Sequence, residues 1–317
     1  VGFWFVQNKE GRKSTGVVVK VGVIGPFSGG VADYGEEIKK GVALAAVKGV
    51  EYIYEDDMCE PTKALAAFKK LVDFDEVHFI IGPGCGAPQE VVAPLLAEKP
   101  VLAIVPSAAS SALFARSGGN FFNVQYSLEK EAKFLADTLT KKGYKKVALV
   151  SYQNPFSQTL TQSFQENFSG DIVENLVFTD ATKAVGSEVL KLKSANPEAI
   201  VVLDISFFFL TGNEKLQLYG ITAPVFATYV TELPAARSMV EGISYSFPGE
   251  LDGDEGGVAA LSAAAARVLG EAIGKCGDEV ACVKTELMSS GQFDNQGVST
   301  RSFVLKKIEG GKVIMAE

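Results

Sequence analysis

The sequence predicts an α/β protein built of two doubly wound, parallel-sheet lobes joined by a hinge that the chain crosses more than once. Short apolar runs alternate with amphipathic stretches along most of the 317 residues, which is the pattern of strands connected by helices. This alternation occurs twice, over residues 17–124 and 145–228. A late helix pair and a late β-like tail follow, and such returns indicate a hinged cleft between two lobes.

The first set of predicted strands and the second each contain four members. They lie at 19–25, 51–55, 77–81 and 101–105, and at 146–151, 171–178, 199–204 and 223–228. The intervening stretches carry apolar residues at helical spacing, as Ile38, Val42 and Ala45 do. Strands separated by helices imply right-handed crossovers and parallel pairing.

The last third of the chain leaves this alternation. VAALSAAAARVLGEAIG after Gly257 predicts a long helix, residues 278–288 predict a second helix, and STRSFVLKKI with GKVIMA predicts a hairpin. The expected division assigns residues 17–124 plus about 250–292 to lobe one, and 125–249 plus about 293–317 to lobe two.

Residues 1–16 are expected to lie outside both lobes. VGFWFV is far shorter than the roughly 20 residues that span a bilayer. One interpretation is a truncated anchor or signal sequence, because Phe3, Trp4 and Phe5 are typical of a membrane interface. The other is a loosely docked terminus. No other segment is expected to span a membrane.

Composition and motifs argue against several functions. The net charge of −8 and the absence of a Lys/Arg run exclude a general nucleic-acid binder. GPGCGA at 82–87 fits a dinucleotide fingerprint, but the next strand ends in VPSAAS without an acid, so no cofactor is expected. The only histidine, His78, lies in a predicted strand, and no CxxC occurs, so neither a catalytic pair nor a metal site is expected. The acidic cluster Glu250, Asp252, Asp254 and Glu255 is interpreted as a solvated hinge loop, with paired catalytic carboxylates or a cation site as the alternative.

The four cysteines fall into two local pairs. Cys59 follows the second strand and Cys85 the third, while Cys276 and Cys282 flank a junction between two helices. Local pairing of an even count favours two disulfides and an oxidising compartment, with four buried thiols in a cytosolic protein as the alternative.

Several strands end in small residues, as in GPFSGG, GPGCGA and PSAAS. Small residues let a ligand approach backbone N–H groups and the N-terminus of the following helix. This arrangement indicates a site for a small molecule.

Four of these segments resemble motifs of the substrate-binding proteins of branched-chain amino-acid-type ABC transporters, which have the type I periplasmic binding-protein fold. The segments are GxxSGxxAxYG at 25–35, the DD–C–P run at 56–61, IIGPxC at 80–85 and PSAAS at 106–110. The resemblance implies a non-enzymatic, monomeric receptor, periplasmic or extracellular and tethered if residues 1–16 are an anchor. It would close on a small ligand and deliver it to an ABC permease. It also implies a Cys59–Cys85 disulfide and a second one at Cys276 and Cys282.

The resemblance also implies a set of ligand contacts in both lobes. These are Tyr34, Gly86, Ser107, Ala108 and Ala109 in lobe one, and Phe156, Ser206, Tyr229 and Glu232 in lobe two. Relatives that bind amino acids have hydroxyl residues where this chain has Gly86 and Ala109, and an acid where it has Val230. Glu232 and Asp204 are the nearest substitutes. Two ligand classes therefore stay open, a free amino acid and a neutral or carboxylate ligand with an apolar body. A ligand-sensing ectodomain of a signalling protein is the alternative function, because it can use the same fold.

Overall fold

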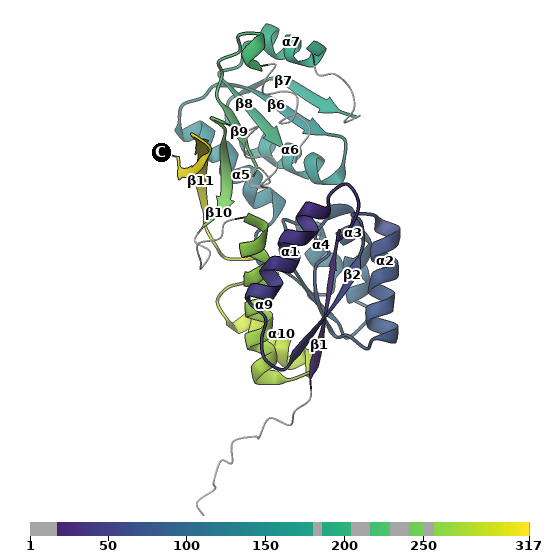
Figure 1. Ribbon diagram of the computed structural model, residues 1–317. Coiled ribbons are helices and arrows are strands. Elements are labelled where there is room, and N and C mark those ends of the chain that lie inside the picture. The colour runs from purple at the N-terminus through teal and green to yellow at the C-terminus, as the bar shows by residue number, and fades with distance from the viewer. Residues whose placement is uncertain (1–17, 180–185, 204–215, 229–240, 250–256, 317) are drawn as a thin grey trace, which may run out of the picture.

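The computed structural model describes residues 18–179, 186–203, 216–228, 241–249 and 257–316. It contains two α/β lobes, one above the other in Figure 1. The predicted fold class is confirmed, with one sheet of five strands and a second of seven.

Lobe one contains an all-parallel sheet in the order β2-β1-β3-β4-β5. Its strands are β1 (Val19–Gly25), β2 (Val50–Asp56), β3 (Phe79–Ile81), β4 (Leu102–Val105) and β5 (Phe121–Asn123). The connecting helices are α1 (Ala32–Leu44), α2 (Pro61–Lys69) with the π-turn Lys70–Phe74, α3 (Gly86–Leu96) and α4 (Ser111–Arg116). The chain reverses its direction of travel across the sheet between β1 and β3, and ligands of open α/β sheets bind at such switch points.

The two faces of this sheet bury different side chains. Phe79 and Ile81 belong to the core that includes α1 and α9 (Gly257–Cys276), whereas Ile80 between them packs with α2 and α3. Successive strand residues point to opposite faces. A strand covered on both faces is apolar throughout, which explains why these strands are continuous hydrophobic runs.

Lobe two contains a mixed sheet in the order β12-β11-β10-β9-β8-β6-β7. The parallel strands are β6 (Lys146–Tyr152), β7 (Asp171–Phe178), β8 (Ala199–Leu203), β9 (Val225–Ala227) and β10 (Ser244–Pro248). The hairpin of β11 (Phe303–Glu309) and β12 (Lys312–Met315) adds antiparallel strands at one edge, as predicted. The helices are α5 (Leu128–Lys141), α6 (Pro155–Asn167) and α7 (Gly186–Ala195).

The chain returns to lobe one after β10 and then leaves it again. Helix α9 lies along α1, and α10 (Val280–Ser289) packs against α9 (Figure 1). The crossovers before α5 and before β11 run side by side, because Asn123 hydrogen-bonds with both Gly297 and Ser299. We keep the lobe boundaries given above as a proposal supported by these contacts.

The structure corrects several sequence-based expectations. β3 begins at Phe79 rather than at 77, so His78 precedes the strand, and its Nδ1 lies 3.0 Å from Asp278 Oδ1. Strands β5 and β10 were not predicted. β5 has only three residues, and β10 is a short run that ends in Pro248, so neither gives a clear apolar pattern. Helix α9 is long and apolar enough to cross a membrane, contrary to expectation, but most of it is buried in the core of lobe one.

Both cysteine pairs are joined in the structure. Cys59 bonds to Cys85 with a Cα–Cα distance of 5.5 Å, and Cys276 bonds to Cys282 with 5.7 Å. We expect thiol titration of the unfolded, unreduced protein to find no free thiol, and titration after reduction to find all four cysteines. Four thiols before reduction would contradict both disulfides.

Candidate functional site

A cavity of about 320 Å³ lies between the lobes, beyond the carboxyl ends of strands in both sheets. Lobe one supplies the N-cap Val31 and Tyr34 of α1, Cys59, the segment 84–87 with Gln89 and Glu90, and the loop 107–110 with Leu113. Lobe two supplies Leu128, Asn154, Pro155 and Phe156. A volume of this size suits a small molecule rather than a polymer.

Six of the nine predicted contact residues line this cavity. They are Tyr34, Gly86, Ser107, Ala108, Ala109 and Phe156. Ser206, Tyr229 and Glu232 lie outside the described residues, as do Asp204 and Val230, so their placement stays a prediction.

The two lobes approach each other at the start of α3. A Cβ atom built on Gly86 would lie 3.9 Å from Cβ of Phe156, which is van der Waals distance. Phe156 is in the first turn of α6, behind the N-cap Asn154, whose Oδ1 accepts a hydrogen bond of 2.8 Å from the Ser157 amide. This cap fixes the start of α6 and hence the place of the Phe156 ring on the wall.

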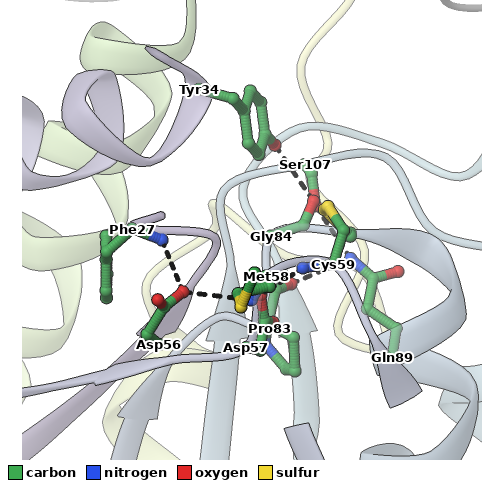
Figure 2. The surroundings of a disulfide bond; sticks show 11 residues. Phe27, Tyr34, Asp56, Asp57, Met58, Cys59, Pro83, Gly84, Gln89 and Ser107 are labelled. Carbon is green, nitrogen blue, oxygen red and sulfur yellow. Dashed lines mark hydrogen bonds between the residues drawn. A yellow bond between two sulfur atoms is a disulfide. The ribbon is translucent and has the colours of Figure 1, made fainter. Parts of the chain in front are cut away.

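Tyr34 lies within the first turn of α1. Its hydroxyl donates a hydrogen bond of 3.0 Å to the Gly84 carbonyl oxygen (Figure 2). A Cβ at Gly84 would lie 2.9 Å from Cε1 of Tyr34 and 2.8 Å from Cδ1 of Ile38. Glycine at position 84 is therefore what lets the ring lie over the β3–α3 loop.

The Cys59–Cys85 disulfide ties the end of β2 to the start of α3 beside the cavity. Met58 and Cys59 both adopt positive φ, 49° and 59°. The Asp57 carboxylate steadies this turn by accepting from the Cys59 amide at 2.9 Å (Figure 2). Asp56 accepts from the amides of Phe27 and Met58 at 2.8 and 3.0 Å. Burial acts to raise the pKa of Asp56, but these bonds and one from Ser28 keep that pKa below its ordinary value.

Asp57 is fully buried, and its Oδ2 has no hydrogen-bond partner. Burial is the main cause that raises its pKa from 3.8 to about 6; the Cys59 amide opposes the rise and the neighbouring Asp56 charge adds to it. The folded protein therefore binds a proton here more tightly than the unfolded chain does. As pH rises from about 4 to about 6, this group lowers the free energy of unfolding, and above pH 6 the loss is constant.

We expect Asp57→Asn to gain stability relative to the wild type as pH rises. Asparagine keeps an acceptor oxygen for the Cys59 amide but cannot ionise. The difference in unfolding free energy between variant and wild type should shift by about 1 to 2 kcal/mol in favour of the variant between pH 4 and pH 7. Urea unfolding across this range measures it, and a difference that does not change with pH would contradict the prediction.

The amino end of α3 presents backbone donors to the cavity. Gly86 and Ala87 occupy its first two positions, where the amides have no acceptor within the helix, and no side chain caps them. The helix dipole adds partial positive charge at this end. The arrangement can bind an oxygen atom that carries negative charge.

Charged groups are scarce on the described part of the wall. Glu90 is the one Asp, Glu, Lys or Arg among its lining residues, and its Oε2 accepts from Arg116 Nη1 at 2.6 Å. Within the described ranges no group of three His, Cys, Asp or Glu could hold a metal ion. A ligand would therefore meet mainly apolar side chains, backbone amides and hydroxyls there.

Gln89 is a lining residue that the sequence reasoning missed. It is fully buried, and its Nε2 donates to the Pro83 carbonyl and to the Ser107 hydroxyl oxygen (Figure 2). The only sequence signal was its position four residues after Cys85, in the first turn after a strand-end loop.

A family model described as periplasmic binding protein matches residues 18–272. The Leu/Ile/Val-binding protein homolog 3 of Brucella melitensis is 28% identical over 196 residues, which cover 57% of this chain and 53% of the relative. The chain thus matches about half the length of that relative. The matched proteins are described as binding proteins rather than enzymes.

Solved structures share the fold over nearly the whole chain. A leucine binding protein from Thermotoga maritima superimposes with a TM-score of 0.84 at 20% identity, covering 95% of this chain and 98% of the other. A solute binding protein of an ABC transporter from R. palustris, in complex with benzoate, gives a TM-score of 0.81 at 19% identity, with coverages of 94% and 95%. At these identities the likeness shows the fold alone.

Proposed function

Because the chain belongs to the periplasmic binding protein family, we propose that it is a non-enzymatic solute receptor. It closes two lobes around one small ligand and delivers that ligand to an ABC permease. The observation that carries the proposal is the cavity between the lobes, lined by strand-end loops of lobe one and the start of α6. Tyr34, Gly86, Ser107, Ala108, Ala109 and Phe156 contact the ligand in this proposal, and Ser206, Tyr229 and Glu232 complete the site.

We propose an extracytoplasmic location, because two disulfides persist best in an oxidising compartment. A tether through residues 1–16 and a monomeric receptor are part of the same proposal.

The ligand class that the wall supports is a small carboxylate with an apolar body, amino acids included. The α3 amides offer donors for a carboxylate, and Tyr34, Leu113 and Phe156 offer apolar surface. Two similar proteins agree with this ligand class. One is named for the binding of leucine, isoleucine and valine, and the structure of the other contains benzoate.

Isothermal calorimetry with leucine and benzoate, alongside toluene and an alkylamine, tests the proposal. We expect one carboxylate to bind with one site per chain. At a hundred times Kd it should increase the free energy of unfolding by about 2.7 kcal/mol and so raise the melting temperature. Binding of neither carboxylate would overturn the ligand class. Binding outside the inter-lobe cavity, seen in a co-crystal structure, would overturn the site.

A further inference from the structure

We infer that Gln89 is a positioning residue that orients the Ser107 hydroxyl to donate a hydrogen bond to an acidic oxygen of the ligand. The inference rests on the proposed function. It assigns to Gln89 and Ser107 the supply of a side-chain hydroxyl donor, which Gly86 and Ala109 lack.

The orientation of the Gln89 amide is decided by Pro83. The Pro83 carbonyl lies 3.1 Å from Gln89 Nε2 and can only accept a hydrogen bond, so the NH₂ group must face it. The same Nε2 lies 2.8 Å from Ser107 Oγ. Both N–H groups of the amide are therefore used, one on each oxygen.

This donation fixes what Ser107 can do. Its Oγ accepts from Gln89, so the hydroxyl proton must point elsewhere, and the described structure gives it no acceptor. Ser107 lines the cavity with 4% of its surface exposed. Its backbone is fixed as well, because Asn123 Nδ2 donates to the Ser107 carbonyl at 2.8 Å. The hydroxyl is thus held beside the cavity with one proton to give.

The buried Gln89 side chain lowers the stability of the fold. Its Oε1 is buried and has no hydrogen-bond partner, and such a group destabilises a folded protein relative to an apolar side chain of the same shape. A buried polar atom without a protein partner calls for an explanation. Orientation of Ser107 is such an explanation.

The chemistry favours an anionic acceptor. A hydroxyl that already accepts a hydrogen bond is polarised and becomes a better donor, and a bond to a carboxylate oxygen is stronger than one to a neutral group. Ser107 shares the cavity wall with Gly86 and Ala87, whose amides begin α3. One carboxylate group could accept from the hydroxyl and from these amides.

The test is a double-mutant cycle measured by calorimetry with benzoate and with leucine. We expect Ser107→Ala and Gln89→Met each to weaken carboxylate binding by at least about tenfold. The double variant should bind no more weakly than Ser107→Ala alone, because Gln89 acts through Ser107. A merely structural role for Gln89 would instead weaken binding again in the Ser107→Ala background.

Two further variants keep the test decisive. Gln89→Glu has nearly the same shape, but its carboxylate would accept a hydrogen bond from the Ser107 hydroxyl. The hydroxyl would then no longer be free to donate to the ligand, so this variant should also weaken binding in the presence of Ser107. Ser262→Ala is the matched control, since Ser262 is a buried serine that donates to the Val258 carbonyl in α9 and does not line the cavity. It should leave affinity unchanged.

The outcomes separate the two proposals. If the wild type binds a carboxylate and Ser107→Ala or Gln89→Met binds it equally well, the inference fails while the proposed function stands. If the two single losses multiply in the double variant, Gln89 does not act through Ser107. If the wild type binds neither carboxylate, the proposed ligand class fails and the inference fails with it.

Discussion

Alanine at position 41 should lower the free energy of unfolding by about 3 kcal/mol, because it would force α1 away from α9. A Cβ on Gly41 would lie 2.2 Å from the Ala259 carbonyl oxygen and 2.6 Å from Cβ of Ser262. The nearest atom belongs to the backbone of a buried helix, so no side-chain rotation can relieve the contact. Urea unfolding of Gly41→Ala against the wild type measures the loss.

The expected loss of stability is opposite in sign to the effect of helix propensity. Gly41 has an ordinary helical backbone, and in an isolated helix alanine would be better than glycine by about 1 kcal/mol. Gly274 supplies the control, since it is an exposed glycine inside α9 whose Cβ would meet nothing within 4 Å. Gly274→Ala should be neutral or stabilising. Equal stability of Gly41→Ala and the wild type would show that α1 and α9 are not tightly packed.

The contact between α1 and α9 also shows where sequence reasoning reached its limit. The Ala-rich pattern after Gly257 predicts the helix, and its late position suggests a return to another lobe. The pattern does not show that Gly41 and Ala259, more than 200 residues apart, lie close together. Periodicity reports which face of a helix is buried, whereas the partner depends on tertiary packing.

The strands illustrate the same limit. Continuous apolar runs such as those of β1 and β8 were predictable because both faces are covered. β5 contains three residues, and β10 joins the sheet through β9 on one side and β11 on the other. Their strand conformation follows from these neighbours more than from their own sequence.

The candidate site was predictable to the extent that it consists of strand-end loops. Small residues after β3 and β4, together with the resemblance, predict that Gly86 and residues 107–109 contact the ligand. Gln89 was not predictable, because a glutamine in the first turn of a helix is usually solvent-exposed. Its hydrogen-bond partners, Pro83 and Ser107, come from two separate loops.

Tyr34→Ala should weaken ligand binding by about 2 kcal/mol or more, roughly thirtyfold, as the loss of a buried aromatic anchor does. The ring forms part of the cavity wall at the start of α1. The fold should change little, since Tyr34 is only half-buried and lies at the end of its helix. Calorimetry with the carboxylate that binds the wild type measures the affinity, and the melting temperature reports on the fold.

Tyr34→Phe separates the two things that Tyr34 does. The hydroxyl is already engaged with the Gly84 carbonyl, so it anchors the ring to the β3–α3 loop and need not contact the ligand. Phenylalanine keeps the apolar surface and loses only the anchor, and we therefore expect it to bind within a few-fold of the wild type. If the ring is the contact, affinity falls in the order wild type, Tyr34→Phe, Tyr34→Ala, with the larger step at the second substitution. Equal losses in both variants would mean that the hydroxyl is the important group, and unchanged affinity in Tyr34→Ala would remove Tyr34 from the site.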